Sequence, residues 1–290
     1  MIKFYISTVM MLLAGVCHAE TQVSENKATD TMTMVQDARC RQVSVNCEMN
    51  GVPMRMMLDT GATNTVIHRG SLSKLKNPRQ MDTRNVQFSG NAKERPDVYL
   101  LNLKFADSAS LRNHPVMALN LDGARSMMAE QIDGIIGMDI LGAMPFTFDV
   151  SAGKLHWGLP QGELKLVPLP GKRDEAGRMV LSIECDGKAH DILLDSGSSV
   201  TRLPASAWPA GAAKQMHMGV SDVNSAEQLV ATIGAPGKVK LAPGVVVEAV
   251  TPVFCGEEEH TLLGMDILGR VRLVHVPSSS QPGGCFFIAL

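Results

Sequence analysis

The sequence Gly-Met-Asp-Ile-Leu-Gly occupies residues 137–142 and recurs without a change at residues 264–269. Two apolar residues precede each copy. An identity over six residues in the same apolar context is too long to be a coincidence in a chain of 290 residues. Repetition of this kind indicates a duplicated structural unit, so a second matching segment is expected upstream of each copy.

The upstream match has an aspartate at its centre. Residues 57–63, Met-Leu-Asp-Thr-Gly-Ala-Thr, correspond to residues 193–199, Leu-Leu-Asp-Ser-Gly-Ser-Ser. Earlier still, residues 43–47 match residues 181–185, and both segments alternate apolar and polar residues as half-buried strands do. A hairpin signal follows each of these strands, Asn-Gly in the first copy and Asp-Gly in the second.

The duplication divides the chain into two lobes, which we place at residues 39–158 and 178–290. Residues 159–177 carry three prolines and several glycines, as is typical of a linker. Residues 20–38 are polar and rich in threonine, and we interpret them as a flexible spacer, with a short pro-segment as the alternative.

Most of the periodic segments outside the repeated motifs have the pattern of strands. β-Branched or alternating runs bounded by Gly, Pro or Asn predict strands at 98–105, 116–119, 238–241 and 245–253. Helical periodicity is short, at 69–75, 140–142 and 267–269. The sequence therefore predicts an all-β, two-lobed fold with short helices.

The first residues indicate export. Residues 1–19 combine an early lysine, an apolar stretch and a small-x-small junction, which is the layout of a secretory signal peptide cleaved after Ala19. A lipid anchor at Cys17 is the alternative. We expect a periplasmic or secreted protein without a membrane span, because no stretch of the chain is long and apolar enough to cross a bilayer.

Composition excludes some partners. Lys and Arg number 27 against 29 Asp and Glu, a formal net charge of −2, so nothing favours binding to nucleic acid. The histidines and cysteines show no metal-ligand spacing, and we expect neither a metal nor another cofactor.

The two Asp-(Thr/Ser)-Gly loops are the candidate site. Each aspartate follows an apolar run, so a buried strand delivers its carboxylate into a loop, where an unpaired charge would be costly. A pseudo-twofold axis between the lobes would bring Asp59 and Asp195 face to face, and carboxylates that close share one proton. The hydroxyls of Thr60 and Ser196 can lock the loops onto backbone, and Gly61 and Gly197 permit a close backbone approach.

These loops resemble the active-site loops of aspartic proteases. Residues 135–137 and 262–264 are similar to the hydrophobic-hydrophobic-Gly element that packs beneath those loops in this family. The Gly-Met-Asp-Ile-Leu sequence that begins at the glycine of each element is most similar to bacterial retropepsin-like proteases. The resemblance implies a two-lobed acid-protease fold in a single chain, hence a monomer that is an internal pseudodimer. It also implies flap hairpins, for which residues 86–98 and 220–229 are the candidates by position.

The resemblance further implies an aspartic endopeptidase that acts on proteins or peptides. One carboxylate would act as general base on a water held between the aspartates, while the other, protonated, would polarise the scissile carbonyl. The alternative function is a catalytically weak or inactive peptide-binding or regulatory protein of the cell envelope.

Other repeated residues have a structural interpretation. Asp139 and Asp266 start short helices and are expected to act there as first-turn acids or caps. Five cysteines remain after Cys17, an odd number, and we expect some of them to pair in an oxidising compartment. A bridge between Cys255 and Cys285 is one option, whereas Cys47 and Cys185 could equally be small buried hydrophobes.

Overall fold

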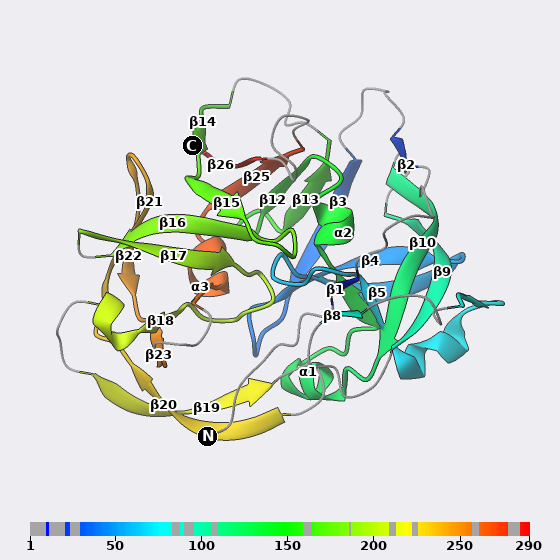
Figure 1. Cartoon of the computed structure of the whole chain (residues 1–290), viewed down its shortest axis with the longest axis horizontal. Helices are drawn as coiled ribbons and strands as arrows, with labels where there is room; N and C mark the ends of the chain where they lie inside the picture. Colours follow the sequence, from blue (N-terminus) through cyan, green and yellow to red (C-terminus); the bar gives the residue numbers. More distant parts are fainter. Residues whose placement is uncertain are drawn as a thin grey trace.

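The computed structural model describes residues 10–11, 21–23, 30–82, 88–89, 96–105, 109–158, 164–185, 187–208, 213–221, 226–256, 261–277 and 285–290. These residues form two lobes built mainly of β-strands, with a sheet between them at the top of the view in Figure 1. The predicted two-lobed, all-β architecture with short helices is confirmed.

The first lobe begins with an antiparallel hairpin, β4 (Val43–Met49) and β5 (Val52–Leu58). Asn50 and Gly51 turn this hairpin with φ angles of 48° and 76°, as the Asn-Gly signal predicts. Strand β5 continues parallel to β11, which pairs with β6, and a long hairpin of β9 and β10 completes the lobe. The bounds are β6 (Val66–His68), β7 (Arg79–Gln80), β9 (Asp97–Lys104), β10 (Ala109–Leu119) and β11 (Gly134–Ile136).

The second lobe repeats this plan. The hairpin of β16 (Met179–Cys185) and β17 (Lys188–Leu194) leads to β24 (Leu262–Leu263), which runs parallel to β17 as β11 does to β5. The remaining strands are β18 (Arg202–Pro204), β19 (Lys214–Ser221), β20 (Ala226–Ile233), β21 (Gly237–Ala242), β22 (Val245–Val250) and β23 (Val253–Cys255). The structural repetition follows the sequence repetition.

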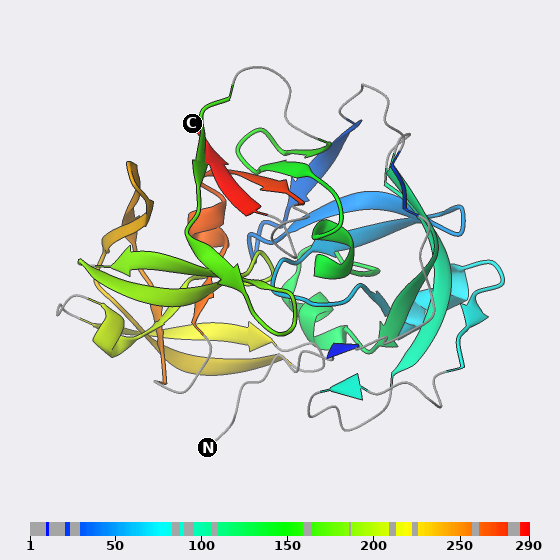
Figure 2. The same ribbon diagram turned by 45° about the horizontal axis from the view of Figure 1, so that its top comes forward.

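A sheet between the lobes takes strands from both halves of the chain. Its order is β14-β26-β25-β12-β13-β3, so C-terminal strands pair directly with strands of the first half (Figure 2). Its core is aromatic, and Phe146 packs against Trp157 and Phe286 with ring centroids 6.2 and 6.1 Å away. The bounds are β3 (Asp30–Gln36), β12 (Phe146–Asp149), β13 (Lys154–Trp157), β14 (Leu166–Pro168), β25 (Arg272–Val276) and β26 (Cys285–Ala289).

Two connecting segments are more ordered than the sequence suggests. The spacer predicted over 20–38 is wrong for residues 21–23 (β2, Thr21–Val23) and for β3, where Met32 and Met34 are buried. The alternation of Thr and Met along β3 is a strand pattern that becomes evident once its partners β4 and β13 are known. In the predicted linker 159–177, β14 and β15 (Gly171–Arg173) pair with β26 and β16, while residues 159–163 lie outside the described residues. Of the predicted signal peptide, the structure describes Met10 and Met11, which form β1 (Met10–Met11) and pair with β8 (Phe88–Ser89).

The helices are short, as predicted. Segments 69–75, 140–142 and 267–269 correspond to η1 (Arg69–Lys74), α2 (Met138–Leu141) and α3 (Met265–Leu268). Two further helices, α1 (Asp122–Met127) and η2 (Ala205–Ala207), were not predicted from the sequence. Glycine inside α1 lowers its intrinsic helix propensity, so tertiary contacts rather than local sequence stabilise it.

The cysteines do not follow the expectation of pairing. Among the described cysteines the structure holds no disulfide, and Cys255 and Cys285 lie in different sheets. Cys47 and Cys185 occupy equivalent positions in β4 and β16 and are buried among apolar side chains, in agreement with their interpretation as small hydrophobes.

Candidate active site

Two buried strands deliver the two aspartates. Strand β5 ends at Leu58, and the Asp59 backbone N–H donates to the Ile136 carbonyl of β11 at 3.0 Å. In the second lobe, β17 ends at Leu194, and the Asp195 N–H donates to Leu263 of β24 at 3.1 Å. The repeated apolar runs therefore fix both aspartates at the ends of equivalent parallel strand pairs.

Hydroxyl groups lock the two loops to each other across the lobe boundary. Thr60 Oγ1 donates to the Leu194 carbonyl at 2.8 Å and accepts from the Ser196 N–H at 3.0 Å. Ser196 Oγ returns both bonds, donating to the Leu58 carbonyl at 2.8 Å and accepting from the Thr60 N–H at 3.0 Å. The predicted hydroxyl-to-backbone contacts are present, and each reaches the opposite lobe rather than its own loop.

Each glycine of these loops lies against the aspartate of the other lobe. A Cβ atom placed on Gly61 would lie 2.5 Å from Asp195 Oδ1, and one on Gly197 would lie closer still to Asp59 Oδ2. No side chain fits at such a separation unless a carboxylate moves. The glycines thus allow the two carboxylates to approach one site from opposite sides.

The two carboxylates have different surroundings. Asp59 Oδ1 accepts from the Gly61 and Ala62 N–H groups at 2.8 and 3.0 Å, and Asp59 keeps part of its surface exposed. Asp195 is buried, and its Oδ1 accepts from the Gly197 N–H at 2.9 Å. Backbone donors favour the ionised form of a carboxylate, so this arrangement stabilises charge on Asp59 more than on Asp195.

The electrostatics follow this asymmetry. Burial raises the pKa of Asp59, while the hydrogen bonds from Gly61 and Ala62 oppose the rise. Burial raises the pKa of Asp195 well above its ordinary value, and the neighbouring charge of Asp59 raises it further. The pair is therefore suited to hold one proton.

The repeated helices support the loops from behind. The N–H of Met138 at the start of α2 donates to the Ala62 carbonyl at 2.8 Å, and Met265 of α3 makes the same bond to Ser198. Asp139 accepts from the Thr65 hydroxyl at 2.8 Å, and Asp266 accepts from the Thr201 hydroxyl at 2.7 Å. Both acids lie in the first turn of their helices, as predicted, whereas the N-cap positions are glycines. Their side chains also tie the loops to the helices.

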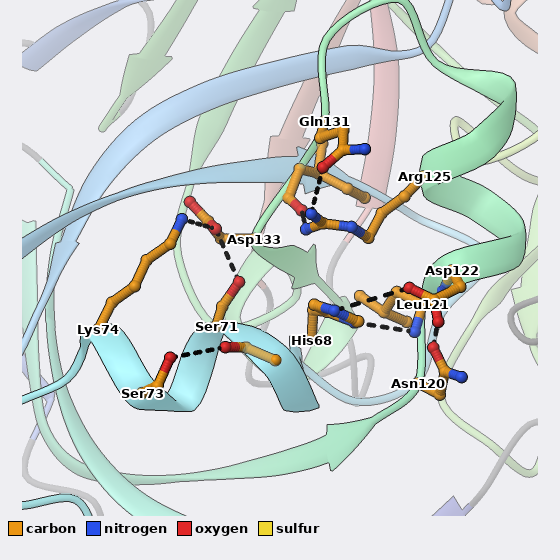
Figure 3. Close-up of polar contacts among 12 residues, drawn as sticks. His68, Ser71, Ser73, Lys74, Asn120, Leu121, Asp122, Arg125, Gln131 and Asp133 are labelled. Atoms are coloured by element: carbon orange, nitrogen blue, oxygen red, sulfur yellow. Dashed lines mark hydrogen bonds and ion pairs between the residues drawn. The ribbon is translucent and has the colours of Figure 1, made fainter.

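A buried acid of the first lobe, Asp133, was not among the residues predicted from the sequence. Asp133 accepts from the Ser71 hydroxyl at 2.7 Å and pairs with Lys74 Nζ at 2.6 Å, both from η1 (Figure 3). Burial opposes ionisation, but the bonds from Lys74, Ser71 and the Arg55 backbone hold the pKa of Asp133 below its usual range. The position equivalent to Asp133 in the second half is His260, so a search for repeated residues passes over it.

A second group of contacts in Figure 3 joins α1 and the residue before it to residues 131–132 and to β6. The Arg125 guanidinium donates to the Gln131 side chain and to the Ile132 carbonyl. His68 Nδ1 accepts from the Leu121 N–H at 3.2 Å. The Arg125 bonds fix the chain immediately before β11, which accepts the Asp59 N–H bond, and the His68 bond fixes the start of α1 against β6.

The flap candidates are described only in part. Residues 86–87 and 90–95 of the first candidate, 86–98, lie outside the described residues. The second candidate falls within the hairpin of β19 and β20, whose connecting residues 222–225 also lie outside them. This hairpin crosses from the second lobe to contact α1 of the first, as Figure 1 shows along its lower edge.

Comparison with known proteins gives one family. Residues 45–140 match the family model described as aspartyl protease, a stretch that includes Asp59, Thr60, Gly61 and the first apolar-apolar-Gly element. A search of curated proteins found no match to the chain. Within the described residues, no helix is long and apolar enough to cross a membrane.

Proposed function

We propose that this chain, whose residues 45–140 match the aspartyl protease family model, is an exported endopeptidase with a catalytic dyad of Asp59 and Asp195. The observation that carries the proposal is the reciprocal contact of each loop glycine with the opposite carboxylate, because it brings an aspartate from each lobe to one site. The proposed substrates are proteins and peptides, and one chain supplies both halves of the site.

The asymmetry of the dyad assigns the roles. Asp59, with two backbone donors and partial exposure, accepts a proton from a water molecule that attacks the carbonyl carbon of the peptide bond. Asp195 donates its proton to the carbonyl oxygen as that oxygen gains charge. In the second step the proton on Asp59 passes to the leaving nitrogen, the C–N bond breaks, and Asp195 recovers its proton from the tetrahedral intermediate. Both carboxyl groups then regain their starting states.

The test is hydrolysis of a diverse peptide library between acidic and neutral pH by wild type, Asp59→Asn and Asp195→Asn. The carboxamide of asparagine can neither accept a proton from water as the base nor carry the proton that the two aspartates share. Each variant is therefore expected to lose at least a thousandfold in kcat/KM. Asp191→Asn serves as the matched control, because this exposed aspartate of β17 pairs with Lys172 on the protein surface. If either dyad variant cleaves as well as wild type, the dyad mechanism is wrong.

The same experiment addresses the alternative function. A folded wild-type protein that binds library peptides without cleaving any of them would be a peptide-binding protein with an inactive site. Export has its own test, because sequencing of the mature N-terminus should begin at Glu20 if the signal peptide is cleaved as proposed.

A further inference from the structure

Gly197 in the second loop lies against both carboxylates. Its N–H donates to Asp195 Oδ1 at 2.9 Å, and its Cα faces Asp59 so closely that a Cβ would clash with the Asp59 carboxylate. A shift of this residue by a few tenths of an ångström therefore changes the surroundings of both members of the dyad. What holds Gly197 in place is consequently of direct importance to the site.

A side chain from the first lobe holds it. Gln42 Nε2 donates to the Gly197 carbonyl oxygen across the lobe boundary, in a partly buried contact. Gln42 immediately precedes β4, and its own carbonyl accepts from the Asp37 N–H at 2.8 Å. Strand β4 in turn pairs from Ser44 to Met49 with β5, the strand that leads to Asp59. Gln42 therefore connects the Gly197 peptide to the framework of the opposite aspartate.

The contact has no equivalent in the sequence repeat. Residues 43–47 match 181–185, so the position equivalent to Gln42 is Val180, whose side chain has no hydrogen-bond donor. The first loop is held differently, because Ala62 supplies a second backbone donor to Asp59. The duplicated lobes thus use different means to fix their two loops.

We infer that Gln42 is a positioning residue of the dyad, which fixes the Gly197 peptide so that its N–H stays on Asp195 and its Cα stays against Asp59. The inference rests on the proposed function of these two aspartates. Gln42 acts through Gly197 rather than on the substrate, so its loss is expected to lower kcat and to leave KM nearly unchanged.

The test compares wild type with Gln42→Met, which keeps the length of the side chain and removes the donor. Loss of one hydrogen bond to the loop predicts a fall in kcat of roughly three- to tenfold, with a KM change of less than twofold. Gln36→Met is the matched control, because Gln36 makes the same kind of side-chain bond to the Arg41 carbonyl within its own lobe. This control is expected to retain wild-type kcat.

Gln42→Glu gives a readout that a merely structural role would not move. A carboxylate at this position lies next to the Gly197 peptide, whose N–H contacts Asp195. The charge of Arg178 also acts on both aspartates. Negative charge favours protonation of the dyad, so the pH profile of kcat is expected to move to higher pH than in Gln42→Met. A lower rate with an unmoved profile in Gln42→Glu would contradict the inference.

The outcomes separate the inference from the function on which it rests. If Asp195→Asn is inactive while Gln42→Met retains wild-type kcat, the dyad stands and the role of Gln42 is wrong. If Gln42→Met raises KM and leaves kcat unchanged, Gln42 contacts the substrate, and the inference is again overturned. If wild type cleaves nothing, the proposed function fails, and the carbonyl ¹³C shift of Gly197 then decides the contact. An unchanged shift in folded Gln42→Met would show that Gln42 does not hold this peptide.

Discussion

Replacement of Thr60 by valine removes one hydroxyl and two bonds between the lobes. Valine has nearly the shape of threonine, so the core beneath the loop is left intact. The Leu194 carbonyl and the Ser196 N–H, which Thr60 Oγ1 contacts at 2.8 and 3.0 Å, lose that partner. Both residues are at most 1% exposed, so water cannot easily take its place.

The expected loss of stability follows from these two groups. A buried polar group left without a partner costs about 1–3 kcal/mol, so the two together cost about 2–6 kcal/mol. The extra buried methyl group of valine returns about 1 kcal/mol. Thr60→Val should therefore lower the free energy of unfolding by about 3 kcal/mol. Thr60→Ser, which keeps the hydroxyl and loses only a buried methyl group, should lose about 1 kcal/mol.

The assay is equilibrium unfolding in urea at neutral pH, followed by far-UV circular dichroism and tryptophan fluorescence, with peptide hydrolysis measured on the same preparations. Thr60→Val is expected to be the less stable variant and to lose most of its peptidase activity. Thr60→Ser should keep its peptidase activity and lose only about 1 kcal/mol of stability. Unfolding free energies of the two variants that agree within about 0.5 kcal/mol would refute the argument that hydroxyl bonds hold the lobes together.

Three further predictions concern the loops, the buried acids and the thiols. Gly61→Ala and Gly197→Ala should each lower kcat/KM at least a hundredfold, because the added methyl group displaces the opposite carboxylate, whereas Gly51→Asn in the exposed β4–β5 turn should have wild-type kinetics. Asp195 has a raised pKa, so wild type should gain stability relative to Asp195→Asn as the pH falls from neutral toward about 4. Asp133 has a lowered pKa, so the stability of wild type relative to Asp133→Asn should instead be lost as the pH falls below about 4. Urea unfolding at a series of pH values measures both trends. Unfolding free energies that change with pH in the same way in wild type and variant would contradict them. Burial raises the pKa of Cys47 to about 12 and those of Cys40 and Cys185 to about 11, so iodoacetamide at pH 8 should alkylate these thiols only in urea, as mass spectrometry of native and unfolded samples can establish.

The parts of the fold that could be predicted are those encoded locally and twice. The apolar runs before Asp59 and Asp195 specify buried strands, and the turn residues specify the hairpins, because each pattern reflects a contact within a few residues. The repetition also predicts that the two loops meet, because two copies of one unit related by a pseudo-twofold axis bring their aspartates together at that axis. Strand β3 escaped prediction because its alternation of Thr and Met has meaning only against its partners β4 and β13.

The candidate site shows the same division. The sequence by itself determined the chemistry of the loops: two carboxylates, each followed by a hydroxyl residue and a glycine. Only the tertiary structure decided how the two loops differ. Ala62 gives Asp59 a second donor, whereas Gln42 reaches Gly197 from a segment 155 residues away. Such differences depend on which groups of one lobe reach the other. A hydrogen bond depends on the distance between two atoms and a raised pKa depends on burial, and neither is determined by the residues that are adjacent in the sequence.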